Sequence, residues 1–143
     1  MKIERILVPT DFSEHSLAAL KYAIELADEY ESEVVLVHVV GPLPKGVTRW
    51  YEPTKLIERY AETASENLQR FEKEATQCFP KCRSELHFGV VHEVIGRLVS
   101  ELKVDLIVMS MRGQTHLVDR LIGGTADKLL RYAPCPILRI RTV

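Results

Sequence analysis

The stretch that decides the fold is an apolar run near the C-terminus, with glycines and a helical pattern after it. It reads Asp105-Leu106-Ile107-Val108-Met109-Ser110, and Met111-Arg112-Gly113 follows directly. Further on, Gly123-Gly124 and Thr125 open a helical pattern that continues to Tyr132. A strand that ends in a glycine turn directs free N–H groups away from the sheet, and a helix N-terminus adds more of them. The stretch therefore predicts a cradle for an anion such as phosphate.

Outward from this stretch, apolar runs and helical patterns alternate along the whole chain. Strands are predicted at residues 3–8, 33–40, 84–91, 104–109 and 137–142. Helices are predicted at residues 14–30, 53–77, 92–102 and 125–132. Strand 33–40 is too uniformly apolar to have a face in water, which is typical of a parallel sheet between helices. The alternation predicts an α/β fold with a doubly wound, five-stranded parallel sheet and right-handed crossovers.

In such sheets ligands bind at the carboxyl ends of the strands, where the winding direction reverses. If the reversal lies between the first and fourth strands, Pro9, Thr10 and Asp11 face residues 110–113 across one crevice. Asp11 has a second interpretation, because Asp after a strand often forms an Asx turn and holds the next helix start. Both interpretations stay open from the sequence.

Length and composition limit the class of protein. The 143 residues predict a single domain over 1–143, and 19 Lys and Arg against 20 Asp and Glu give a net charge of −1. No basic excess favours nucleic acid as a partner. No apolar run approaches the roughly 18 residues of a membrane helix, and the N-terminus has no signal-peptide pattern, so we expect no membrane partner and a cytoplasmic location.

The three cysteines and the histidines do not form a recognisable metal or redox motif. Cys78 and Cys82 lie four residues apart without a matching second pair, because Cys135 stands alone, so reduced thiols are expected rather than a zinc site. A hydrolase or redox enzyme that uses Cys78 or Cys82 is the weakest of the hypotheses. His38, inside an apolar strand, is expected to be a core histidine with a backbone partner.

Several stretches, in order and with the spacing of that family, make the chain resemble the universal stress protein family. They are Ile6-Leu7-Val8-Pro9-Thr10-Asp11-Phe12-Ser13-Glu14-His15-Ser16, Leu36-Val37-His38-Val39, Asp105-Leu106-Ile107-Val108-Met109, Arg112-Gly113 and Leu130-Arg131-Tyr132-Ala133-Pro134-Cys135-Pro136-Ile137-Leu138. The resemblance covers essentially the whole chain. It implies a Rossmann-like sheet of the adenine-nucleotide α-hydrolase type, with strand order 3-2-1-4-5, and a homodimer.

Members of this family that bind ATP carry the motif Gly-x2-Gly-x9-Gly-[Ser/Thr]. On this chain the motif falls on Ser110, Gly113, Gly123 and Gly124, so its first glycine and its hydroxyl are replaced. Thr125 lies one residue late and supplies the hydroxyl only if the loop shifts. Losing one hydrogen bond to a charged group weakens binding about tenfold to a hundredfold. The resemblance also implies nucleotide contacts at Pro9, Asp11 and Val39, and Arg112 is placed where it can meet a phosphate.

Two functions of different classes follow. The first is a regulatory protein of the stress response that binds ATP, with or without Mg²⁺, and at most hydrolyses it slowly, because no residue is evidently placed as a general base. The expected nucleotide-binding residues are Pro9, Thr10, Asp11, Val39, Ser110, Arg112, Gly113, Gly123, Gly124 and Thr125. The second is a dimeric interaction protein of the same fold without nucleotide. In either case the C-terminal strand is the expected dimer edge, unless Arg139 and Arg141 guard it in a monomer.

Overall fold

A single parallel sheet organises the protein. The computed structural model describes residues 2–43, 46, 52–111 and 124–141, with only the backbone at 124–126. The strands are β1 (Arg5–Pro9), β2 (Glu33–Val40), β3 (Cys82–Phe88), β4 (Leu106–Ser110) and β5 (Ile137–Ile140). They pair in parallel in the order β3-β2-β1-β4-β5, which confirms both the predicted fold class and the strand order.

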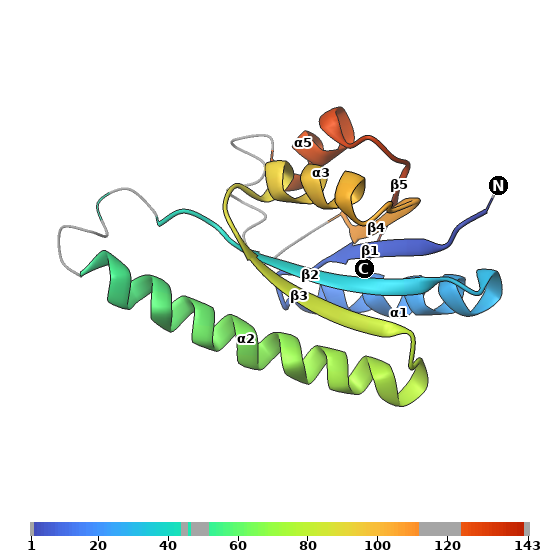
Figure 1. The fold of residues 1–143 in the computed structure, drawn as a ribbon, viewed down its shortest axis with the longest axis horizontal. Helices are drawn as coiled ribbons and strands as arrows, with labels where there is room; N and C mark the ends of the chain where they lie inside the picture. Colours follow the sequence, from blue (N-terminus) through green and yellow to red (C-terminus); the bar gives the residue numbers. More distant parts are fainter. Residues whose placement is uncertain (1, 44–45, 47–51, 112–123, 142–143) are drawn as a thin grey trace.

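The helices cover both faces of the sheet. Figure 1 shows α1 (Glu14–Tyr30) and α2 (Pro53–Cys78) on one face, with α3 (Val91–Glu101) and α5 (Gly124–Tyr132) on the other. The predicted helices are all confirmed to within about two residues, the usual uncertainty of a helix end. None of the helices in the described ranges combines the length and the apolar character that crossing a bilayer requires.

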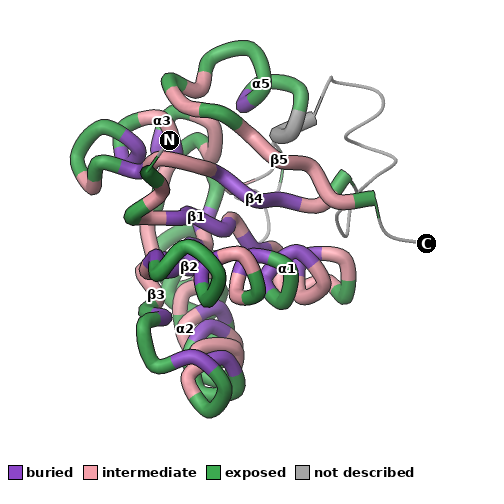
Figure 2. Tube along the Cα trace, turned by 90° about the vertical axis from the view of Figure 1, so that its right-hand side faces the viewer, coloured by how far each residue is buried: buried purple, intermediate pink, exposed green. Residues whose placement is uncertain are grey.

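Alternating side chains of the central strands build two apolar cores. On the α1 and α2 face, Ile6, Val8 and Leu36 are fully buried. On the α3 and α5 face, Leu7, Val35 and Ile107 are fully buried. The buried inner strands and the half-buried edge strand β5 are visible in Figure 2. Burial on both faces explains why β2 carries an unbroken apolar sequence.

The predicted bounds of β3 were wrong at both ends. The strand begins at Cys82, two residues earlier than predicted, and it ends at Phe88, three residues earlier. Gly89 ends it with φ +137, a conformation that residues with a side chain rarely adopt, and an added Cβ would lie 3.0 Å from Val94 Cγ2. The helical start of α3 at Val91 thus lies close against the end of the strand.

Candidate functional site

The sheet reverses its winding direction between β1 and β4, and Pro9 stops their pairing there. β1 pairs with β2 over all five residues, but its ladder with β4 covers only Ile6–Leu106 and Leu7–Ile107. The Arg5 carbonyl accepts from Asp105 on the β4 side, whereas Thr10 N donates to Val37 on the β2 side. Backbone groups of successive strand residues face opposite neighbours, so the nitrogen of Pro9 faces β4. Proline has no N–H, and no hydrogen bond can be donated to β4 at this position. The proline therefore ends hydrogen bonding on the side where the two strands flank the predicted crevice.

The turn after β1 is held by a closed set of hydrogen bonds. Thr10 is buried, and its Oγ1 accepts from Phe12 N at 3.0 Å and lies 2.9 Å from Ser16 Oγ. Asp11 Oδ1 accepts from Ser13 N at 3.0 Å, so the Asx-turn interpretation of Asp11 is confirmed. Ser13 in turn caps α1 by accepting from Ser16 N at 3.1 Å. Hydrogen bonds of short polar side chains in residues 10–16 therefore hold the conformation of this turn.

An aromatic cluster formed with residues of β2 and α2 packs against the same turn. Phe12 has φ 67, which costs a residue with a side chain about 1–2 kcal/mol. Its ring lies 4.4 Å from the His38 ring and 5.5 Å from the Phe71 ring, centroid to centroid. Packing between β2 and α2 thus offsets the unfavourable backbone conformation.

His38 is a core histidine with a backbone partner, as predicted. Its Nδ1 lies 2.7 Å from the Thr10 carbonyl, which can only accept, so Nδ1 carries the proton. Burial lowers the pKa of His38 from its usual 6.5, outweighing the Thr10 hydrogen bond and the Asp11 carboxylate, which both raise it. At neutral pH the side chain is therefore an uncharged imidazole that ties β2 to the turn after β1.

Val39 lies further toward the carboxyl edge than the end of β1. The Thr10 N–H reaches the Val37 carbonyl, so Val39 lies two residues beyond the last contact between β1 and β2. Its side chain is buried in the core of the α3 and α5 face. The Val39 backbone is consequently near Pro9, Thr10 and Asp11 at one edge of the sheet.

On the other side of the crevice, Ser110 ends β4 and Met111 follows it. Ser110 is half-buried and pairs with Ile140 of β5, and Met111 N donates to the Ile140 carbonyl at 3.0 Å. Gly124 and Thr125 form the first turn of α5, as the glycine pattern predicted. Three predicted site residues, Arg112, Gly113 and Gly123, lie outside the described residues. Parallel pairing thus brings Pro9, Thr10, Asp11, Val39 and Ser110 to a common edge.

Sequence reasoning overlooked one residue at this edge, Arg139. The sequence suggested only a charge guarding β5, but Arg139 Nη2 lies 3.3 Å from the Met111 carbonyl. Its Nε is buried without a hydrogen-bond partner, the one such side-chain atom in the described part of the chain. The available sequence signal was the strand alternation, which puts Arg139 on the same face as Ile137, whereas its position opposite Met109 comes from the register in the structure.

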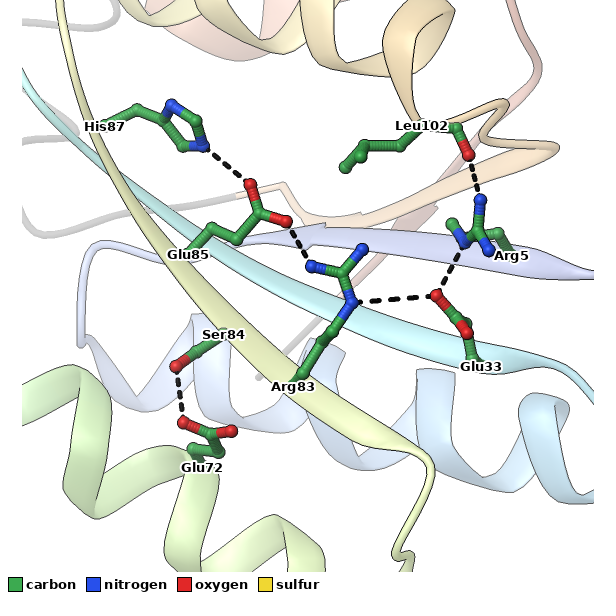
Figure 3. A network of polar contacts seen from close by, with 8 residues as sticks. All are labelled: Arg5, Glu33, Glu72, Arg83, Ser84, Glu85, His87 and Leu102. Carbon is green, nitrogen blue, oxygen red and sulfur yellow. Dashed lines mark hydrogen bonds and ion pairs between the residues drawn. The ribbon is translucent and has the colours of Figure 1, made fainter.

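A second polar cluster crosses β1, β2 and β3 (Figure 3), from Arg5 and Glu33 at the first residues of their strands to His87, which pairs with Val39. Arg5 Nε lies 2.6 Å from Glu33 Oε1, and Arg83 Nε lies 3.7 Å from the same oxygen. Glu85 bonds Arg83 and lies 2.8 Å from His87 Nε2. Burial opposes the ionisation of Glu85, but the hydrogen bonds from His87 and Arg83 outweigh it and lower the pKa of this carboxyl. Each charge has a partner, so the cluster reads as a cross-strand ladder on the edge strand β3.

Two of the three cysteines, Cys82 and Cys135, lie in surroundings that disfavour a reactive thiolate, and Cys78 is exposed at the end of α2. Burial, reinforced by Glu72, raises the pKa of the Cys82 thiol to about 11, and burial also raises the pKa of Cys135. A thiol with a raised pKa is a poor nucleophile at neutral pH. Within the described ranges, no three His, Cys, Asp or Glu residues are grouped as metal ligands.

Comparison with known proteins gives a consistent match over nearly the full chain. The model of the Universal stress protein family matches residues 2–141. Universal stress protein MJ0531 of Methanocaldococcus jannaschii is 33% identical over 139 residues, which cover 96% of this chain and 82% of that protein. The solved structure of MJ0577 from the same organism has a TM-score of 0.84 at 27% identity, and covers 100% of this chain and 99% of that one.

Two more distant structures share the fold and contain nucleotides. One is a universal stress protein from Archaeoglobus fulgidus in complex with dAMP, with a TM-score of 0.68, 19% identity and coverage of 98% and 99%. The other is a universal stress protein in complex with cAMP, with a TM-score of 0.67, 21% identity and coverage of 98% of both chains. At these identities the likeness establishes the fold of the present chain.

Proposed function

Because the chain belongs to the universal stress protein family, we propose that it binds an adenine nucleotide and acts in stress regulation through the ligand-bound state. The proposed ligand is ATP, with or without Mg²⁺, and the proposed place is the crevice between the ends of β1 and β4. The chain acts as one domain over residues 1–143 in the cytoplasm, without nucleic acid or membrane as a partner. Its net charge of −1 agrees with that absence of nucleic acid.

The observation that carries the proposal is the broken ladder at the switch point. Pro9 withholds a hydrogen bond from β4 where the winding reverses, the position at which open α/β sheets bind ligands. The first turn of α5 follows β4 in the chain, and helix N-termini favour phosphate. The dAMP and cAMP complexes of two proteins with this fold support adenine as the base.

The proposed contacts divide between the two sides of the crevice. Pro9, Thr10, Asp11 and Val39 hold the nucleoside, with the Val39 backbone at the adenine edge and Asp11 at the ribose or at a metal bound to the phosphates. A carboxylate beside phosphates would repel them unless Mg²⁺ lies between, since Mg²⁺ on nucleotides needs only one or two protein carboxylates. The phosphate side consists of Ser110, Arg112, Gly113, Gly123, Gly124 and Thr125.

Turnover of bound ATP is expected to be slow. In the described part of the crevice, Asp11 accepts from Ser13 N, and His38 donates to the Thr10 carbonyl. We therefore assign both groups a role in holding the turn, and we assign no general base to the attack of water. Nucleotide binding would then control a conformation or a partner, not a rapid reaction.

Titration calorimetry of nucleotide-free protein tests the proposal. ATP should bind in the micromolar to low millimolar range, and Gly113→Val and Gly123→Val should abolish binding because each adds a bulky side chain to the glycine motif. Gly96→Ala is the control, since an added Cβ at this position in α3 meets no atom within 4 Å. No heat from wild-type protein at several millimolar ATP would refute the proposal.

We also propose a homodimer through β5. This strand pairs with β4 on one side and forms an edge of the sheet, and all four of its residues are half-buried. Antiparallel pairing of two such edges about a two-fold axis would satisfy both chains. Light scattering coupled to size exclusion should give the mass of a dimer. The mass of a monomer would contradict it.

The alternative function, an interaction protein without nucleotide, has one observation in its favour. The family motif is altered at Ser110 and at Gly124. Mass spectrometry of the protein as purified separates the two functions. Retained adenine nucleotide would favour the first function, whereas a ligand-free dimer that ignores ATP would favour the second.

A further inference from the structure

Arg139 lies on the face of β5 that α5 covers. The register pairs it with Met109, and Ile137, two residues earlier, packs into the core of the α3 and α5 face. Leu138 and Ile140 pack into the opposite core. Strand alternation therefore directs Arg139 to the side of the sheet on which α5 begins.

The charged head of Arg139 reaches the chain that leaves β4. Nη2 lies 3.3 Å from the Met111 carbonyl, a long bond that uses one of the five guanidinium donors. Nε is buried and has no hydrogen-bond partner among the described residues, where no carboxylate forms an ion pair with Arg139 either. A buried donor without an acceptor is costly, so this arginine has the geometry of a group whose acceptor comes from elsewhere.

We propose that the missing acceptor is a phosphate group, and that Arg139 binds the phosphates of the nucleotide in the β1 and β4 crevice. The inference rests on the proposed function and adds a residue outside the glycine motif. The planar guanidinium remains charged and offers paired donors that match phosphate oxygens. Without a bridging Mg²⁺ the Asp11 carboxylate disfavours an anion on the β1 side, so the phosphates would lie toward Ser110, Met111 and Arg139.

This role has a distinctive consequence for ligand preference. A residue that contacts only phosphate strengthens ATP binding without affecting adenosine. Arg139 would thus compensate for the hydroxyl that the motif lacks at Gly124. The ratio of ATP affinity to adenosine affinity, measured in one protein sample, reports this contribution and does not depend on the fraction of folded protein.

Calorimetric titrations with adenosine, AMP, ADP, ATP and inorganic tripolyphosphate test the proposal. Arg139→Gln should weaken ATP binding about tenfold or more and leave adenosine binding within about twofold. Arg139→Lys should retain part of the ATP affinity, because it keeps the charge but loses the paired donors. The matched control is Arg131→Gln, which removes the same charge from an exposed position in the last turn of α5.

The outcomes separate this proposal from the proposed function. If ATP and adenosine weaken equally in Arg139→Gln, or neither weakens, Arg139 is not a phosphate ligand although nucleotide binding stands. If wild type binds no adenine compound but binds tripolyphosphate through Arg139, the anion site stands and the nucleotide function fails. If wild type binds neither adenine compounds nor tripolyphosphate, both proposals fail.

Discussion

The two sides of the crevice are built in different ways. On the β1 side, Thr10, Asp11, Ser13 and Ser16 satisfy one another, and His38 adds a bond from the neighbouring strand. On the β4 side, Arg139 reaches the Met111 carbonyl with one donor and keeps another buried without a partner. The comparison suggests that one side of the site is held by hydrogen bonds within the chain, whereas the polar groups of the other side are fully paired only when a ligand is bound. Substitutions of the side chains that hold the β1 turn should therefore lower stability even without nucleotide, whereas those on the β4 side should change binding with little effect on stability.

The largest effect on stability is expected from Thr10→Val. The change keeps the shape of a buried side chain but leaves Phe12 N without its acceptor, which should lower the free energy of unfolding by about 1–3 kcal/mol. Denaturant unfolding without nucleotide measures the loss. The control is Thr76→Val, whose hydroxyl bonds the Lys73 carbonyl on the exposed side of α2. Equal losses in the two variants would show that the turn is not specially dependent on Thr10.

On the β4 side, Gly124→Ser is expected to strengthen nucleotide binding. The serine restores the hydroxyl of the family motif in the first turn of α5, which is worth about 1.5 kcal/mol or roughly tenfold in ATP affinity. Adenosine affinity should not change. Gly96→Ser, at an open position of α3, is the control. Weaker ATP binding in Gly124→Ser would mean that the first turn of α5 approaches the ligand too closely for a side chain.

The fold was largely predictable from the sequence, whereas the different hydrogen bonding on the two sides of the crevice was not. Apolar runs such as 33–40 identify buried parallel strands, and the resemblance gave the strand order. Pro9, Val39 and Ser110 lie near the carboxyl ends of parallel strands, so they come to one edge of the sheet even if the strand ends are predicted a residue or two off. The bonding direction of Pro9 and the unmet donor of Arg139 depend on register, which a single sequence does not specify.

A smaller effect on stability is expected from the protonation of His38, which makes the free energy of unfolding depend on pH. Burial lowers its pKa in the folded protein below the usual 6.5, so the unfolded chain binds the proton more readily. The free energy of unfolding should therefore be fully retained above pH 6.5 and fall as the pH drops from 6.5 toward the lowered value. Unfolding at pH 7 and pH 5 should show a larger loss in wild type than in His38→Asn, which keeps a donor for the Thr10 carbonyl. Equal losses would contradict the assigned direction.

The smallest effect is expected from the charged ladder on β3. Glu85→Gln removes a carboxylate whose partners, Arg83 and His87, are accessible to water. Pairs of this kind contribute about 0–1 kcal/mol, and salt screens them. Unfolding in low and high salt should show a difference between wild type and variant that shrinks with salt. Loss of ATP binding in this variant would instead connect the ladder to the site.

The most direct test of the central claim is the map of backbone amide shifts when ATP is added to isotope-labelled protein. The proposal predicts the largest changes at residues 10–12, 39, 110–111 and 124–127, together with Arg139, and little change at Arg5, Glu33 and Arg83, which lie at the opposite ends of their strands. Changes centred on the ladder or on α2, with the ends of β1 and β4 unaffected, would contradict a nucleotide site at the crevice.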